Sequence, residues 1–226
     1  DPADPRARQA LARLAPTFER SDAFLDVVDE LLAKGHLVQA EDALARWTPP
    51  YASREQQARV LLLKGRLCLG RGQAAEALAQ FAAAETAAQS ATSGRRARLG
   101  RARALLEQPD GRAQGMALLE TLQQETAGTA LAGEAAWRLL QTRDAAPEAR
   151  LAALQTFLRD FPDGPHAAAA HAARADLLES LHGTISRPVL AERLAAFRAA
   201  EDLKGRTAAL ERLGRAIPAL DRKSVV

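Results

Sequence analysis

The chain has 226 residues, of which 47% are hydrophobic but only 4% are aromatic, and alanine dominates the apolar set. Alanine is the strongest helix former, and runs of β-branched residues are absent, so the composition predicts an all-α fold with no sheet. The net charge of +3 is small for this length, the single cysteine excludes an internal disulfide, and no run of 18 apolar residues predicts a membrane-spanning helix.

The first part of the chain predicts a terminal helix followed by a helical hairpin. Residues 1–20 are expected to form an N-terminal cap helix, because Asp4 and Pro5 suit its N-cap and first helical position. Apolar residues at helical spacing then predict two helices between residues 21 and 47. Gly35 stands between them, where a tight turn requires a residue that tolerates positive φ.

The best-formed hairpin lies between residues 58 and 89. Its two arms each carry an apolar stripe, and Gly72 stands at the turn between them. Upstream, Ser53 and Gln56 have the spacing of a capping box, which predicts that the first arm begins there. Residues 90–94 are polar and small, and they are expected to form a loop after this hairpin.

Three further hairpins follow, and Pro109-Asp110-Gly111 is a strong turn signal in the first of them. The third is expected at 95–108 and 112–126, the fourth at 134–158, and the fifth between His166 and residue 202. A last helix from about Leu203 to Ile217 is expected to cap the stack, with a tail to residue 226. The whole chain, 1–226, is therefore predicted to be one domain, with helical hairpins at 21–202 and a C-terminal cap helix and tail at 203–226.

Units of 37 or 38 residues can be aligned with one another from the sequence alone. When the units start at Ser21, Ala58, Arg96 and Glu134, position 20 is always small and position 24 is always large. The small residues are Ala40, Ala77, Gly115 and Ala153, and the large ones are Leu44, Phe81, Leu119 and Phe157. This repetition is typical of a helical solenoid, in which each unit packs on its neighbours.

The aligned units resemble the tetratricopeptide repeat family. The second unit matches best, at Gly65, Gly72, Ala77, Phe81 and Ala84, while the third and fourth units lack the glycine of the turn. The resemblance covers residues 21–165 directly and implies a right-handed α-α superhelix of about five hairpins with capping helices at both ends. It also implies that a partner segment binds in a concave groove.

A narrower resemblance concerns the segment from Phe157 to Ala170. Its two aromatic residues four apart, the following proline and the alanine-rich helix resemble a junction in tetratricopeptide proteins of the bacterial envelope, such as outer-membrane-assembly lipoproteins. The first two hairpins also resemble the N-terminal domain of lipoproteins that activate penicillin-binding proteins. These resemblances imply a periplasmic or outer-membrane-associated protein, with a signal peptide or lipid anchor possible upstream of Asp1; a cytoplasmic protein is the alternative.

The repeat register places candidate partner-binding residues on the first helix of each hairpin. The residues expected to face the groove are Leu25, Asp29, Arg59, Leu62, Arg66 and Arg138. Arg59 and Arg66 are seven residues apart and so project from one helix face. A groove that is acidic at one end and basic further along could orient a peptide; the alternative is that these are solvated charges on amphipathic helices.

A second candidate site is the basic patch of Arg95, Arg98 and Arg101, which lies in a run with Arg96 and Arg103. Such a patch would suit an acidic partner, an anionic lipid or a phosphate, unless it is only an exposed helix face. No aromatic residues stand near it to stack on bases, so nucleic acid is not expected as the partner.

No residue pattern predicts catalysis, a cofactor or a metal. The histidines at 36, 166, 171 and 182 lack the spacing of a metal motif, and Cys68 falls at a packing position between helices. Gly65, Gly70 and Gly72 lack the Lys-Ser/Thr pair and the preceding strand of a phosphate-binding loop. We therefore expect a non-enzymatic interaction or scaffolding module that binds a protein or peptide. The alternatives are a regulatory or docking domain of a larger enzyme system, such as a peptidoglycan synthase activator, or an enzyme whose site has no recognised pattern.

Overall fold

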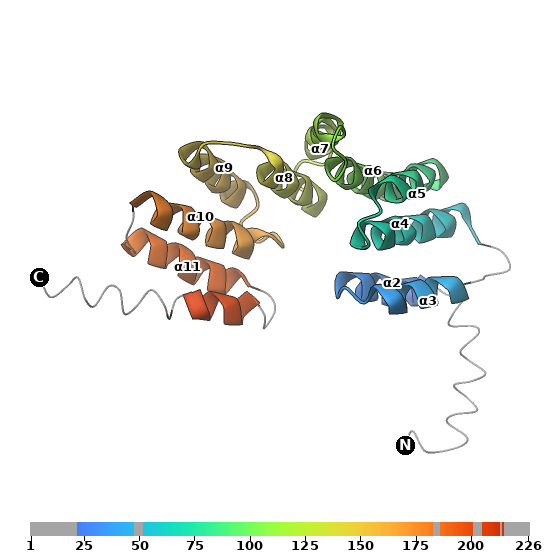
Figure 1. Cartoon of the computed structure of the whole chain (residues 1–226), viewed down its shortest axis with the longest axis horizontal. Coiled ribbons are helices and arrows are strands. Elements are labelled where there is room, and N and C mark those ends of the chain that lie inside the picture. The colour runs from blue at the N-terminus through green and yellow to red at the C-terminus, as the bar shows by residue number, and fades with distance from the viewer. Residues whose placement is uncertain (1–21, 48–51, 183–185, 201–204, 213, 215–226) are drawn as a thin grey trace, which may run out of the picture. The chain divides into compact units, whose positions relative to one another are not determined.

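The computed structural model describes residues 22–47, 52–182, 186–200, 205–212 and 214, and every regular element within these ranges is a helix (Figure 1). The helices, in chain order, are α2 (Asp22–Ala33), α3 (Leu37–Arg46), α4 (Arg54–Gly70), α5 (Ala74–Ala87), α6 (Ala91–Leu106), α7 (Arg112–Glu125), α8 (Ala130–Thr142), α9 (Pro147–Asp160), α10 (Ala167–His182) and α11 (Arg187–Ala199). Residues 205–212 form a further helical segment. The all-α prediction is confirmed for the described residues.

The chain divides into two compact units, residues 1–118 and 119–226. In the first unit α2 packs on α3 and α4, α4 packs on α5, and α5 packs on α6. In the second unit α8 packs on α9, α9 on α10, and α10 on α11. Helices that follow one another in the chain therefore pack together, which is consistent with a helical repeat. The right-handed superhelix, the number of hairpins and the single domain stay predictions.

Two predicted glycine turns are confirmed. Gly35 and Gly72 have φ angles of +77° and +73°, a region that residues with a side chain rarely adopt. At the second turn the amide of Gln73 donates to the carbonyl oxygen of Cys68 at 2.9 Å, which closes the end of α4 and sends the chain back along it as α5.

The predicted alternation of small and large packing residues holds for most of the repeat. All four large residues at position 24 are buried, and so are three of the four small residues at position 20. Ala153 is the exception, because it is exposed on α9 while its neighbour Leu154 is fully buried. In the fourth unit the predicted register therefore holds at Phe157 but not at Ala153.

Phe81 on α5 forms the centre of the first unit's best-packed region. Its side chain is only 1% exposed, and its ring lies against the backbones of Gly65 on α4 and Gly100 on α6. A Cβ atom added at Gly65 would lie 2.6 Å from the ring, and one added at Gly100 would lie closer still. The two glycines thus let three consecutive helices approach one aromatic ring.

The predicted polar loop at residues 90–94 is wrong, because α6 already begins at Ala91. Ser90 is its N-cap and accepts a hydrogen bond from the amide of Ser93 at 3.1 Å. The carboxylate of Glu55, at the start of α4, accepts further hydrogen bonds from the amides of Gln89 and Ser90. A residue of α4, two helices earlier in the chain, therefore helps to fix this helix start.

The predicted ends of the chain are only partly described. The expected N-terminal cap helix, residues 1–20, and the expected tail after residue 214 lie outside the described residues. Within the expected C-terminal helix, residues 205–212 are helical. Among the described helices, none combines the length and the apolar character needed to cross a membrane.

Candidate functional site

Oppositely charged residues on α2 and α4 form a row of contacts between the two helices. Arg66 on α4 forms an ion pair with Asp29 on α2, and Arg59 forms one with Asp26. The Nη1 group of Arg59 also donates a 3.2 Å hydrogen bond to the carbonyl oxygen of Asp22. The seven-residue spacing of Arg59 and Arg66 on α4 is close to two helical turns, so both side chains reach the same neighbouring helix.

These contacts change the interpretation of the predicted groove. The sequence placed Asp29, Arg59 and Arg66 on one face, and the structure brings them together, but as pairs that bind each other across two helices. Much of their charge is therefore balanced within the protein. Their role in binding a partner stays a prediction.

The two leucines predicted to face the groove have different surroundings. Leu25 is fully buried in the core with Phe24 and Val28, so its assignment to a partner-binding surface is wrong. Leu25 is buried because α2 packs on both α3 and α4, so more of its surface is covered than the repeat register assumed. Leu62 is partly buried and packs against the cluster around Phe81, which leaves only part of it accessible.

Arg138 belongs to a polar junction of the second unit. Its Nε donates to Glu134 at 3.0 Å one turn earlier on α8, and Glu134 also binds the ring of His166 just before α10. The hydrogen bond from His166, with help from Arg138, lowers the pKa of Glu134 to about 2. The His166 ring also stacks on Trp137, with the ring centres 5.4 Å apart. These contacts indicate that Arg138 stabilises the junction between α8 and α10.

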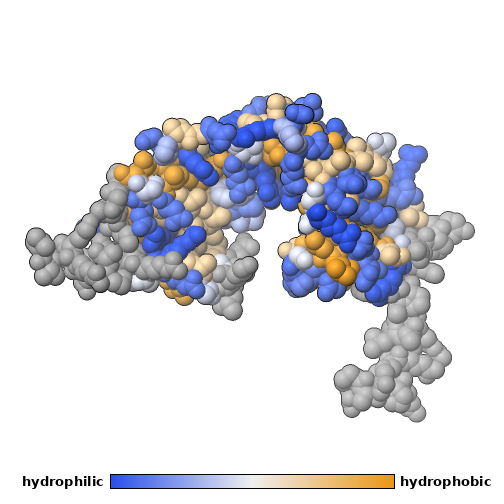
Figure 2. Space-filling view, in the orientation of Figure 1, coloured by the Kyte–Doolittle hydropathy of each residue, from blue (hydrophilic) through white to orange (hydrophobic). Residues whose placement is uncertain are grey.

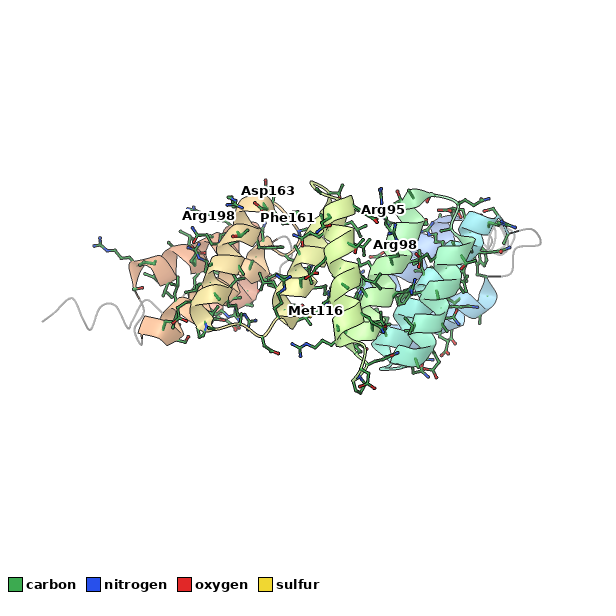
Figure 3. All side chains as sticks on the ribbon, turned by 90° about the horizontal axis from the view of Figure 1, so that it is seen from above. Arg95, Arg98, Met116, Phe161, Asp163 and Arg198 are labelled. Atoms are coloured by element: carbon green, nitrogen blue, oxygen red, sulfur yellow. The ribbon has the colours of Figure 1, made fainter. Side chains whose placement is uncertain are left out.

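The same junction contains the predicted segment with two aromatic residues. The ring centres of Phe157 and Phe161 lie 5.4 Å apart, and those of Trp137 and Phe157 lie 5.5 Å apart. Figure 3 shows Phe161 beside Asp163 where the chain leaves α9. The aromatic residues therefore act in packing between helices of the second unit.

The predicted basic patch lies along α6, a helix with five arginines and no carboxylate. Glu85 on α5 pairs with Arg101 at 2.5 Å and with Arg98 at 3.7 Å, so one carboxylate serves two guanidinium groups. Arg95 forms no ion pair with any described residue. Arg95 and Arg98 follow one another along α6 in Figure 3.

Arg66 connects α4 to this patch. Its pKa is lowered, first because the side chain is partly buried and then because the positive charges of Arg103 and Arg96 are near it. We call Arg66 and the five arginines of α6 the arginine cluster; its members are Arg66, Arg95, Arg96, Arg98, Arg101 and Arg103. Burial is the larger cause of the lowered pKa of Arg66, and the two neighbouring guanidinium groups add to it.

The sequence reasoning separated Arg66 from the patch and so missed this connection. Arg96 and Arg103 are seven residues apart on α6, as Arg59 and Arg66 are on α4. The repeated spacing was the signal that could have linked them. Ala97 and Ala104, each one residue after an arginine of this pair, are both buried.

The other candidate residues have packing surroundings. Cys68 packs against the cluster around Phe81, and burial, followed by the charge of Glu76, raises the pKa of its thiol. The Nδ1 atom of His171 on α10 lies 2.7 Å from a carboxylate oxygen of Glu192 on α11, and Glu192 also binds Arg174. Within the described part of the chain, no three His, Cys, Asp or Glu residues are grouped so that they could hold a metal ion.

The fold and the charged surface together define the chain as an all-α protein of serially packed helices that carries a cluster of arginines on two neighbouring helices. Comparisons with protein-family models, with curated proteins and with solved structures find no match. The resemblance to tetratricopeptide repeats therefore rests on the sequence pattern.

Proposed function

We propose that the protein is a non-enzymatic interaction module, and that the arginine cluster binds an acidic segment of a protein partner. The observation that carries the proposal is the charge of α6, where five arginines stand without an Asp or Glu in the same helix. Residues on a helix of this kind repel one another, and a partner with carboxylates would relieve the repulsion.

The charges around the cluster support a site on the α6 side of α4. On the α2 side, Asp26 and Asp29 bind Arg59 and Arg66. On the α6 side, Arg96 and Arg103 add positive charge beside Arg66, and Glu85 already serves Arg98 and Arg101. Carboxylates from a partner would therefore meet several guanidinium groups between α4 and α6.

A protein segment is favoured over a nucleic acid because α6 contains no aromatic residue on which a base could stack. The surface of the first unit also mixes hydrophilic and hydrophobic residues (Figure 2), which suits a partner with both kinds of side chain. The bacterial envelope, expected from the sequence resemblance, remains part of the proposal.

The test is a quantitative pull-down from a lysate of the source organism with the wild-type chain, with Arg96→Glu/Arg103→Glu and with a matched control, Arg159→Glu/Arg198→Glu. The control makes the same change in net charge at two exposed arginines of the second unit. We expect at least one acidic protein to be retained by the wild type and by the control but lost from the cluster variant. A purified partner should then bind with an affinity that falls as salt is raised.

Two results would contradict the proposal. The first is the same set of proteins on all three baits, which would show that the arginine cluster selects no partner. The second is loss of recovery after nuclease treatment, which would identify nucleic acid as the ligand of the cluster.

A further inference from the structure

A cavity of about 400 Å³ lies in the second unit between α10, α11 and the helical segment 205–212. Figure 1 shows this segment beside α11, which in turn lies beside α10. Eight of the described residues that line the cavity are alanines, among them Ala172, Ala196 and Ala209, and none of these described residues has an aromatic ring. The walls are therefore smooth and apolar, and they are built from side chains too short to fill the space between the three helices.

One buried cation forms part of this apolar wall. The side chain of Arg193 on α11 is only 8% exposed. Its Nη1 donates to the carbonyl oxygen of Arg212 at 2.7 Å, and its Nη2 binds Glu179 on α10. Its Nε is buried and has no hydrogen-bond partner among the described residues. A buried donor without an acceptor is unfavourable, so a ligand acceptor that reached this atom would be stabilised.

We propose that the cavity binds a medium-chain fatty acid, with its aliphatic chain along the alanines and its carboxylate at Arg193. The volume is enough for roughly thirteen methylene groups, if each needs about the 30 Å³ that a water molecule occupies in the liquid. Alanine walls without rings suit a flexible aliphatic chain, and an apolar pocket with few polar groups is the usual form of a small-molecule site.

A half-exposed guanidinium group at the cavity gives an anionic head group a place to bind. Arg212 also lines the cavity, and its side chain is 46% exposed although Asp176 lies 3.9 Å from it, so a ligand carboxylate would compete with Asp176 for this guanidinium group. The nearby carboxylates of Asp176 and Glu179 are already directed at these two arginines. This inference does not depend on the proposed function, because every residue of the cavity belongs to the second unit and the arginine cluster belongs to the first.

The first test is calorimetric titration of the full chain with octanoate, decanoate and dodecanoate below their micelle concentrations, with decylamine and decanol as matched probes. We expect one saturable site, a dissociation constant that falls about fourfold per added methylene, and a levelling off once the cavity is full. Decylamine, with the opposite charge, should bind at least tenfold more weakly than decanoate. Equal binding of decanoate, decanol and decylamine, or no saturable binding of any of them, would overturn the proposal.

The second test uses variants of the cavity. Ala172→Phe should fill the space and weaken decanoate binding by more than tenfold. Arg193→Lys keeps the positive charge but removes the Nε donor, and it should also weaken binding. Arg212→Gln removes only a half-exposed side chain, so it keeps the proposal testable if either buried variant fails to fold. Arg198→Gln, on α11 like Arg193 but outside the cavity, should bind decanoate as the wild type does. Folded Ala172→Phe and Arg212→Gln proteins that bind decanoate with wild-type affinity would refute the site.

Discussion

The packing of Phe81 between two glycines makes a sharp prediction about α6. Gly100→Ala would place a methyl group against the ring of Phe81, which is only 1% exposed and cannot move without displacing its neighbours. Gly94→Ala, on the same helix, would meet nothing closer than the Cβ of Ala88 at 4.0 Å. The two substitutions are chemically identical, so they differ only in the space available to the new methyl group.

The expected magnitudes follow from two opposing terms. Replacing glycine by alanine within a helix stabilises it by ~1 kcal/mol, and Gly94→Ala should show this gain in full. At Gly100 the same gain is opposed by overpacking, which costs ~1–3 kcal/mol in a well-packed core. The helix term cancels between the variants, so their free energies of unfolding should differ by about 2 kcal/mol, with Gly100→Ala the less stable.

Urea unfolding followed by tryptophan fluorescence would measure this difference. The chain has two tryptophans, Trp47 in the first unit and Trp137 in the second, so a Trp137→Phe background reports on the first unit alone. With a denaturant slope of roughly 2 kcal/mol per molar urea, the midpoints of the two variants should differ by about 1 M.

A double-mutant cycle would test the cause. In the Gly100→Ala background, Phe81→Leu should be less destabilising than in the wild type, because the smaller side chain makes room for the new methyl group. The reasoning is refuted if Gly100→Ala is as stabilising as Gly94→Ala, or if Phe81→Leu costs the same in both backgrounds.

The remaining predictions concern Leu25 and Glu55. Leu25→Ala should destabilise the first unit by ~2–5 kcal/mol in the same urea assay, because Leu25 is fully buried. A change in the free energy of unfolding within ~0.5 kcal/mol would show that Leu25 is a surface residue. Hydrogen bonds from Ser93, then from Ser90 and the amide of Gln89, lower the pKa of Glu55 to about 2 from an ordinary value of 4.5. A depressed pKa in the folded state gives stability that is complete above about pH 4.5 and is lost as the pH falls towards 2. The urea midpoint of the wild type should therefore fall over that interval, and it should fall less in Glu55→Gln. An unchanged pH profile of the midpoint would contradict the role of Glu55.

The features that the sequence predicted correctly depend on residues close together in the chain. The positive φ angles at Gly35 and Gly72 are requirements of a three-residue turn. The capping box of Ser53 and Gln56 is present with both of its hydrogen bonds, at 3.0 and 3.1 Å, and it too is complete within four residues. Such signals carry their own physical cause, and they place helix ends without knowledge of the tertiary structure.

The features that the sequence missed depend on residues far apart. The start of α6 needs Glu55, which lies about 35 residues before Ser90 in the chain. Leu25 is buried because α2 packs on two helices at once, whereas the assumed register gave it one covered face. The cavity at Arg193 forms only where α10, α11 and residues 205–212 meet. No pattern within a single repeat contains these contacts.

The strength of the ion pairs decides how the arginine cluster can work. The side chains of Arg66 and Asp29 are 34% and 47% exposed, and pairs exposed to this extent contribute at most ~1 kcal/mol each. The apolar contacts of Leu25, Val28 and Leu63 therefore hold α2 against α4, and the ion pairs add little. If the proposed partner binds, its carboxylate would replace Asp29 beside Arg66 at small cost to the fold. Arg66 would then be both an internal contact and the edge of the proposed surface. A charge reversal at Arg96 and Arg103, away from α2, is therefore the cleaner test of that surface.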